Sequence, residues 1–300
     1  MRVSVLGGGA SFEREVSMNS ARFCVDALKD ALDATLMIYD GDITTLSNLL
    51  EREKPDAVIN LLHGSDGENG RVQSVFELMK TPYSHSGVLA SALAMDKMKS
   101  KQIYRDAGIN TPHAVEFELG APIERGQFSG DRFIVKPSNG GSSDNIYLLN
   151  DFDNVPEIAA ACDQPMMVED YIPGREVTVG IIGDRLLGIT EVIVGDIFGY
   201  DDKYVDDRTR HITPAPLPND IYTLCAQQAL SAHTALGCRG LSRSDFRWDE
   251  TRGADGLFLL ETNTQPGMRP QALVVEQAVH AGMSHSDLCL WMVNDCSLDR

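Results

Sequence analysis

The first ninety residues alternate between short apolar runs and amphipathic segments. "RVSVLGGG" is an apolar run that ends in glycines, and the segment beginning "SFEREVSMNSARF" then carries apolar positions at helical spacing. "DATLMIYD" and "DAVINLLHG" follow strand patterns, with the helical pattern "ITTLSNLLEREK" between them. Strands that alternate with helices predict a parallel α/β sheet.

The pattern changes beyond this region. "SALAMDKMKSKQIYRDAGIN" predicts one helix with a glycine stop, and "RFIVKPSNGGSSDNIYLL" predicts a strand, a glycine loop and a strand. The run from "MMVEDYIPGREVTV" to "GITEVIVG" predicts an antiparallel region, and "NDIYTLCAQQALSAHTALG" a long helix. The segment from "RGLSRSDF" to "LLETNT" predicts a pair of strands. We expect three domains, over residues 1–95, 96–180 and 181–300.

Composition excludes several classes of protein. The chain has 300 residues, of which 43% are apolar and 23% charged, as in ordinary globular proteins of more than one domain. Apolar runs long enough to span a bilayer and a signal peptide are both absent from the sequence, so we expect a cytoplasmic protein with no membrane partner. The 6 cysteines are scattered singly, which favours reduced thiols over zinc ligands or disulfides.

The formal net charge of −18 argues against binding to a nucleic-acid backbone. It does not exclude a nucleotide, because a few lysines can make one pocket positive. The first glycine stretch, "GGGASF", does not fit dinucleotide binding, since Phe12 stands where the third glycine of GxGxxG belongs. Glu13 follows at the start of a helix, where it either holds an ammonium group or complements the helix dipole. On this segment alone the second interpretation is favoured.

Two further segments carry charges beside turns. In "VKPSNGGSSD", Lys136 precedes glycines and serines, which indicates either a phosphate cradle or a surface hairpin, with equal weight. In "MMVEDYIPGREVTV", Glu169 and Glu176 flank a Pro-Gly turn, which could hold adenine and ribose. A hairpin with acidic ends is favoured for that segment taken by itself. Lys97, in an amphipathic helix, is most simply interpreted as solvated.

The segment "LFLLETNTQPGMRPQAL" ends an apolar strand with polar groups. Because strand side chains alternate, Glu261 and Asn263 share one face, and Asp245 lies in the preceding strand. If the two strands pair, three oxygen-bearing side chains converge, as Mg²⁺ prefers. A buried polar cluster is the alternative, although two adjacent carboxylates need a cation or a proton to coexist. Arg243 would share their face and could stabilise an oxyanion.

Taken in chain order, several long motifs resemble those of the D-alanine–D-alanine ligases, members of the ATP-grasp superfamily. They are "GGGASFEREVSMNSA", "LLHGSDGENGRVQSVFELMKTPYSHSGVLASALAMDKMKSK", "VKPSNGGSS", "VEDYIPGREVTV", "YDDKY", "GCRGLSRSDF" and "LETNTQPGM", and the resemblance extends over nearly the whole chain. The resemblance implies a mixed α/β and α+β architecture, an ATP-grasp fold preceded by an N-terminal parallel-sheet (pre-ATP-grasp) domain. It implies ATP-dependent joining of two D-alanines through an acyl phosphate, for peptidoglycan precursors. It also implies two Mg²⁺ ions, for which Mn²⁺ can substitute, and allows a homodimer.

The resemblance also assigns residue roles. ATP would be bound by Lys97, Lys136, Ser143, Glu169, Ile172, Glu176 and Lys203. The metal ligands would be Asp245, Glu261 and Asn263. The catalytic set would be Glu13, Ser142, Tyr204, Arg243 and Gly267. Substrate would be contacted by Glu13, His63, Arg269, Ala272 and Leu273. Residues 196–209 would form the loop that closes over the intermediate.

The chain departs from the family pattern at several positions. Gly140 replaces a usual glutamate, Asp144 and Asn145 replace a hydrophobic residue and glycine, and Arg269 and Pro270 follow the Pro-Gly-Met turn. Ala272 stands where a serine normally holds the carboxylate of the second D-alanine. Three hypotheses therefore stay open: a D-alanine–D-alanine ligase, an ATP-grasp ligase with another acceptor, and a nucleotide-binding relative without catalysis. Tyr204 favours an amine acceptor.

Overall fold

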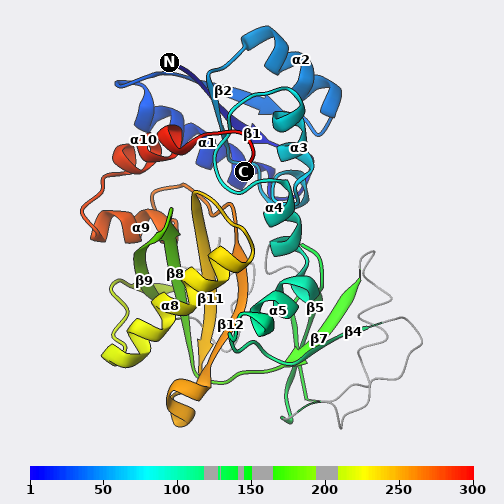
Figure 1. Ribbon diagram of the computed structural model, residues 1–300, viewed down its shortest axis with the longest axis vertical. Helices are drawn as coiled ribbons and strands as arrows, with labels where there is room; N and C mark the ends of the chain where they lie inside the picture. Colours follow the sequence, from blue (N-terminus) through cyan, green and yellow to red (C-terminus); the bar gives the residue numbers. More distant parts are fainter. Residues whose placement is uncertain (118–127, 129, 141–144, 151–164, 194–208) are drawn as a thin grey trace.

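The computed structural model describes residues 1–117, 128, 130–140, 145–150, 165–193 and 209–300, which contain three separate sheets (Figure 1). The first sheet is parallel, with the strand order β2-β1-β3, and comes from the N-terminal part of the chain. Its strands are β1 (Arg2–Gly8), β2 (Asp33–Tyr39) and β3 (Ala57–Asn60). The predicted parallel sheet is thus confirmed.

Helices connect and cover this sheet. They are α1 (Arg14–Leu28), α2 (Ile43–Glu53), the 3₁₀ helix η1 (Gly64–Asp66) and α3 (Arg71–Leu78). The helix α10 (His285–Asp295), from the far end of the chain, packs on α1, and Figure 1 shows it beside the N-terminal strands. Buried Cys24 and Cys289 face each other there with their sulfur atoms 3.4 Å apart, both as free thiols. The two ends of the chain therefore share one core.

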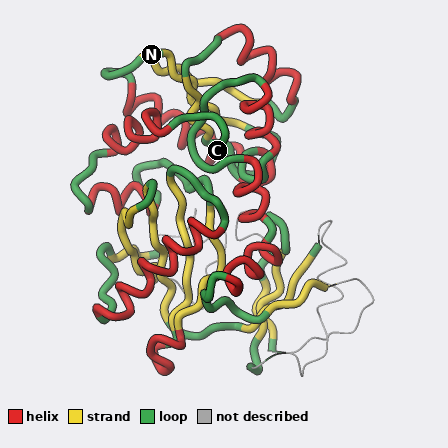
Figure 2. The backbone as a smooth tube through the Cα atoms, viewed as in Figure 1, coloured by secondary structure: helices red, strands yellow, loops and turns green. Residues whose placement is uncertain are grey.

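The other two sheets are antiparallel and lie next to each other below the first one (Figure 2). The four-stranded sheet, in the order β4-β7-β5-β6, comprises β4 (Ala114–Phe117), β5 (Phe133–Pro137), β6 (Tyr147–Leu149) and β7 (Met166–Asp170). The five-stranded sheet, in the order β10-β9-β8-β11-β12, comprises β8 (Arg175–Ile182), β9 (Arg185–Ile193), β10 (Arg210–Ile212), β11 (Leu241–Trp248) and β12 (Leu257–Asn263).

The Pro-Gly turn after β7 is the crossing between these sheets. β7 pairs with β4 and β5, whereas β8 pairs with β9 and β11, so a hairpin of β7 with β8 is excluded. Gly174 has a φ of +99°, and a Cβ there would collide with the Trp248 carbonyl, so the crossing requires glycine. The domain boundary proposed at residue 180 falls inside β8.

The single helix predicted around Lys97 is wrong: there are two, α4 (Val88–Met95) and α5 (Lys97–Asp106). Asp96 between them is extended, and its carboxylate caps α5 by accepting from the Lys99 amide at 3.0 Å. The Lys97 amide donates to the Ser138 carbonyl beyond β5 at 2.8 Å. This tertiary bond and the aspartate cap favour a break that helical periodicity does not reveal.

One face of the five-stranded sheet is covered by α8 (Asn219–Ala235), which crosses it in Figure 1. The core on this side includes Val177, Val179, Phe246 and Leu259. The remaining elements are η3 (Glu250–Gly256) and α9 (Leu273–His280). Since side chains alternate along a strand, the residues between these core positions face the opposite side, which forms the site. Among the described helices, none is long and apolar enough to cross a membrane.

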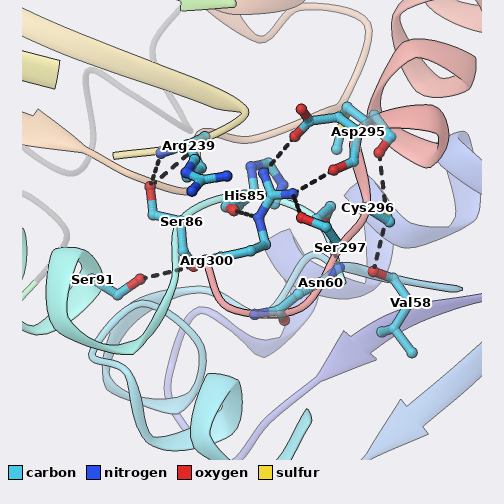
Figure 3. Close-up of polar contacts among 12 residues, drawn as sticks. Val58, Asn60, His85, Ser86, Ser91, Arg239, Asp295, Cys296, Ser297 and Arg300 are labelled. Atoms are coloured by element: carbon cyan, nitrogen blue, oxygen red, sulfur yellow. Dashed lines mark hydrogen bonds and ion pairs between the residues drawn. The ribbon is translucent and has the colours of Figure 1, made fainter. Parts of the chain in front are cut away.

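Arg300 ties the C-terminal segment to the loop before α4 (Figure 3). Its buried guanidinium donates to the carbonyls of His85 and Asp295, to the Ser297 hydroxyl at 2.9 Å, and to the Asp295 carboxylate. We expect Arg300→Met to lower the free energy of unfolding by about 2 kcal/mol, because it leaves these acceptors without a donor. Urea denaturation tests this, with exposed Arg22→Met as the control. Equal stability of both variants would contradict it.

Candidate functional site

The open face of the five-stranded sheet carries a row of polar side chains. β11 alternates buried Ser242, Ser244 and Phe246 with half-buried Arg243 and Asp245. In the antiparallel register of β11 and β12, Arg243 lies opposite Asn263 and Asp245 opposite Glu261. Paired residues of neighbouring strands point to the same face, so these four side chains lie together.

A bulge interrupts the expected alternation of β12. Asp245 pairs with Glu261, but the next residue of β11, Phe246, pairs with Leu259, so Leu260 has no partner in the register. A bulge re-aims the side chains that follow it. The core strand of β12 can therefore end with Glu261 and Asn263 on the same open face as Asp245.

Asp245 is held by two donors. Arg243 Nε and an Nη bind its two carboxylate oxygens at 2.9 and 2.7 Å, and the Thr178 hydroxyl of β8 donates to Oδ1 at 2.6 Å. The bidentate pairing fixes the plane of the guanidinium. Asn263 Oδ1 accepts from the Gln265 amide at 2.6 Å. The candidate metal ligands on this face are thus two carboxylates, of Asp245 and Glu261, and the side-chain amide of Asn263. Oxygen ligands of this kind suit Mg²⁺.

Lys97 stands at one end of this row. Its ammonium lies 3.4 Å from Glu261 Oε2 and donates to the Gly140 carbonyl at 2.6 Å, and its side chain is 9% exposed. The interpretation of Lys97 as solvated is therefore wrong. It lines a pocket together with Glu68, Gly140, Glu261 and Asn263. A cation beside oxygen ligands in a pocket is an arrangement suited to phosphate.

Glu169 is buried between two lysines. Lys136 Nζ lies 2.5 Å from its Oε1, and Lys101 Nζ lies 2.9 Å from its Oε2. Burial by itself would raise the pKa of Glu169, but the two ammonium groups outweigh it and lower that pKa. Burial would likewise lower the pKa of Lys136, yet the surrounding carboxylates, Glu169 first, raise it. The carboxylate is thus a fixed, ionised acceptor.

The crossing between the sheets is braced by Arg247 of β11. Its Nε donates to the Ile172 carbonyl at 3.1 Å, and an Nη lies 3.5 Å from Glu176 Oε2. Tyr171 packs its ring against the same guanidinium, 5.7 Å from the centroid. Arg247 thus fixes both the backbone of the crossing and the first carboxylate beyond it.

Glu13 closes the site from the N-terminal side. It is the N-cap residue of α1, makes no side-chain cap bond, and is only 5% exposed. Its carboxylate fills the space beside Gly64, where a Cβ would collide with it. Asp66 accepts from the amides of Ala10 and Ser11 at 2.7 and 2.8 Å and so holds the preceding loop. The side chain is therefore aimed inward and does not cap its own helix.

His63 lies between the N-terminus of α1, where Glu13 stands, and the turn after β12. Its Nδ1 is 3.1 Å from Glu68 Oε1, and its buried Nε2 has no hydrogen-bond partner among the residues the structure describes. Nε2 is 4.0 Å from where a Cβ of Gly267 would stand. The Met268 amide contacts the Ser20 hydroxyl of α1 at 3.4 Å, which positions the turn. An unpartnered ring nitrogen is thus directed toward Gly267.

A second pocket extends from Arg243 and Asp245 toward α9. It is also lined by Gly267, Arg269, Ala272, Leu273, His211 and Glu176. His211 Nδ1 is 2.8 Å from Glu276 Oε2, so β10 and α9 are linked at its rim. The lining thus carries two arginines, Arg243 and Arg269, together with the carboxylates of Asp245 and Glu176. Because Asp245 and Glu261 are paired, this pocket adjoins the one around Lys97.

The sequence was compared with known proteins. Residues 127–294 match the family described as D-ala D-ala ligase C-terminus. A D-alanine–D-alanine ligase of Ruegeria pomeroyi is 49% identical over 301 residues, which is 100% of this chain and 97% of the relative. One of Cereibacter sphaeroides (strain ATCC 17025) is 47% identical over 302 residues, with the same coverage. The chain belongs to the D-alanine–D-alanine ligase family.

Solved structures agree with this membership. A D-alanine–D-alanine ligase from Bacillus anthracis complexed with ATP has a TM-score of 0.84 and 27% identity. A second structure of that ligase has a TM-score of 0.85 and 30% identity. Each comparison covers 98% of this chain and 97% of the other. The family, enzyme class and ATP-grasp fold expected from the motifs are confirmed.

Four residues that the resemblance to the ligase family assigned lie outside the described part of the chain. They are Ser142, Ser143, Lys203 and Tyr204, and residues 196–208 of the closing loop lie outside it too. The structure brings most of the other assigned residues to the two adjoining pockets, to the Glu169 cluster or to the surroundings of His63, and it places Ile172 at the crossing between the sheets. Sequence reasoning missed Lys101, Glu68 and Arg247. For Lys101 a signal existed, because it stands four residues after Lys97 and so shares its helix face.

Proposed function

We propose that this chain joins two D-alanine molecules at the expense of ATP, in the cytoplasm, to supply a dipeptide for peptidoglycan precursors. The observation that carries the proposal is the register of β11 and β12. It sets Arg243, Asp245, Glu261 and Asn263 on one face, between the pocket around Lys97 and the pocket around Gly267. A phosphoryl donor and a carboxylate acceptor therefore meet beside the same charged row. The homodimer suggested by the family is part of the proposal.

Mg²⁺ would be held by Asp245, Glu261 and Asn263. Among the described residues, no group of three His, Cys, Asp or Glu side chains could hold a metal by itself. This fits Mg²⁺, which is usually bound by one or two carboxylates together with substrate phosphates. When bound, the ion supplies positive charge to the phosphate oxygens. The same set would accept Mn²⁺.

The chain's own residues would do the rest. Lys97 and Lys136, with Ser143 and Lys203, would hold phosphates, and Glu169, Ile172 and Glu176 would hold the nucleoside. Glu13 would take the ammonium group of the first D-alanine, and His63, polarised by Glu68, would lie beside its carboxylate. That carboxylate would attack the γ-phosphorus, giving an acyl phosphate and ADP.

The second amine would then attack the acyl carbon, and phosphate would leave from a tetrahedral intermediate. Arg243 and the Gly267 amide would stabilise its oxyanion. Arg269 lines the same pocket as Ala272 and Leu273, and it would replace the missing serine hydroxyl with a cation for the second carboxylate. Ser142 and Tyr204 would complete the set around Glu13.

A substrate panel tests this proposal. ATP-dependent phosphate release should be measured with D- and L-amino acids, singly and in pairs, with the products identified by mass spectrometry. We expect robust turnover with D-alanine alone, giving the dipeptide. Strong turnover only with a different acceptor would overturn the D-alanine assignment and favour a specialised ligase, which the Arg269 and Ala272 pocket would explain. Binding of Mg·ATP without turnover on any pair would overturn catalysis altogether.

Ala272→Ser tests the acceptor end of the pocket. Ala272 is the N-cap residue of α9 and provides no side-chain cap. A serine there should raise the free energy of unfolding by about 1 kcal/mol, because its hydroxyl can accept from a first-turn amide. It should also lower the KM of the second D-alanine, since the residue lines the pocket. The size-matched Ala272→Cys should do neither, and an unchanged KM in the serine variant would contradict the assignment.

A further inference from the structure

Lys101 is a buried cation to which the proposed reaction assigns no role. It lies on α5, is 0% exposed, and points toward the four-stranded sheet. Its ammonium group contacts the Thr111 hydroxyl at 2.9 Å, the Pro112 carbonyl at 3.4 Å and Glu169 Oε2 at 2.9 Å. The first two contacts are hydrogen bonds and the third is an ion pair, and together they enclose the ammonium group within the protein. Lys101 therefore acts on a ligand only through a neighbour.

That neighbour is Glu169, which is 2% exposed and has one oxygen on each of two lysines. The lysines come from different elements. Lys136 lies within β5, whereas Lys101 on α5 is also anchored to the backbone and hydroxyl of the segment before β4. Lys101 thus fixes one carboxylate oxygen relative to α5 and that segment.

The chemistry of the carboxylate decides which base it can face. An ionised carboxylate only accepts hydrogen bonds, whereas a protonated one also donates. A 6-aminopurine offers donors at its exocyclic nitrogen, and a 6-oxopurine offers an acceptor there. A carboxylate that is fixed and ionised therefore favours the amino form and repels the oxo form.

We propose that Lys101 is a positioning residue for purine selection, which holds Glu169 as an ionised acceptor so that the site prefers a 6-aminopurine nucleotide to a 6-oxopurine nucleotide. The inference rests on the proposed function, which places Glu169 at the base. Burial lowers the pKa of Lys101 to about 8, against the attraction of Glu169. This cost of burying an ammonium group is consistent with a role that a neutral residue cannot fill.

The test compares ATP with ITP, which differ at the 6-position of the purine, by calorimetric titration of the full chain in Mg²⁺ without D-alanine. We expect Lys101→Met to reduce the preference for ATP over ITP about ten-fold, as for a lost hydrogen bond to a charged group. In turnover, the loss should appear in the KM of ATP and leave kcat near the wild-type value. Lys99→Met, an exposed neighbour on the same helix, should change neither quantity.

A double-mutant comparison separates positioning from a structural role. If Lys101 acts through Glu169, then Lys101→Met should have no further effect on the ATP-to-ITP ratio in a Glu169→Gln background. A folded Lys101→Met protein with the wild-type ratio would overturn the inference. Where that variant does not fold, Thr111→Val, which removes one anchor of Lys101, decides: a reduced ratio supports the inference and an unchanged one overturns it.

Failure of the proposed function gives a different result. If the wild-type protein binds ATP and ITP equally well, Glu169 does not contact the purine base. That result would overturn both this assignment and the inference that rests on it. A preference that persists unchanged in folded Lys101→Met would overturn the inference alone. Absence of turnover with D-alanine would overturn the proposed reaction, while the nucleotide titrations would still decide the role of Lys101.

Discussion

Glu261→Gln is expected to abolish most Mg²⁺-dependent turnover while the protein stays folded. Glu261 ends β12 opposite Asp245, with Lys97 at 3.4 Å, so an isosteric amide keeps the packing and removes one of two carboxylates. Substitution of a residue that only supports a metal ligand typically lowers metal affinity or activity about 10- to 100-fold. Loss of a direct ligand should therefore lower kcat/KM by more than about 100-fold. Steady-state phosphate release at fixed ATP, across a Mg²⁺ titration, measures the effect.

A control variant and a Mg²⁺ titration separate loss of a metal ligand from the loss of one negative charge. Glu250→Gln makes the same chemical change at a largely exposed position and should leave turnover unchanged. If Glu261 is a ligand, higher Mg²⁺ should restore part of the activity of its variant, whereas a purely structural loss would not respond. Turnover that stays at the wild-type level would remove Glu261 from the metal set.

The charged row on the sheet could be predicted because it depends on short-range rules. Alternation along a strand and pairing of consecutive strands put Arg243, Asp245, Glu261 and Asn263 together without knowledge of the rest of the chain. The bulge at Leu260 did not disturb this prediction, since it precedes the pairs that matter. The parallel N-terminal sheet was predicted from another local pattern, the alternation of strands with helices.

The lysines could not be placed in the same way. Lys97 has the local pattern of a solvated helix residue, and its burial depends on the helix break at Asp96, which a carbonyl of a distant segment helps to fix. Lys101 and Glu169 are far apart in sequence and meet only when α5 packs beside the four-stranded sheet. The inward position of the Glu13 carboxylate likewise depends on a residue distant in sequence, because it fills the space beside Gly64. Contacts between elements distant in sequence leave no local pattern in the sequence. Only the resemblance of the motifs to those of a known family could suggest them.

Arg243→Met is the second substitution with a large expected effect. Arg243 shares its pocket with Gly267, and its guanidinium is oriented by both oxygens of Asp245. Such preorganised donors act mainly on charge that develops in the transition state. We therefore expect kcat to fall about 100- to 1,000-fold, as for loss of one oxyanion donor, while the KM of ATP changes little.

The substitution also removes the partner of Asp245, so Arg243→Lys is needed as a companion. Lysine keeps a positive charge beside Asp245 but cannot reproduce the planar bidentate geometry. If Arg243 serves the oxyanion, the lysine variant should bind Mg·ATP normally, by calorimetry, and still have a strongly reduced kcat. If Arg243 only neutralises Asp245, the lysine variant should regain nearly full turnover. That recovery, in a folded protein, would exclude Arg243 from the stabilisation of the tetrahedral intermediate.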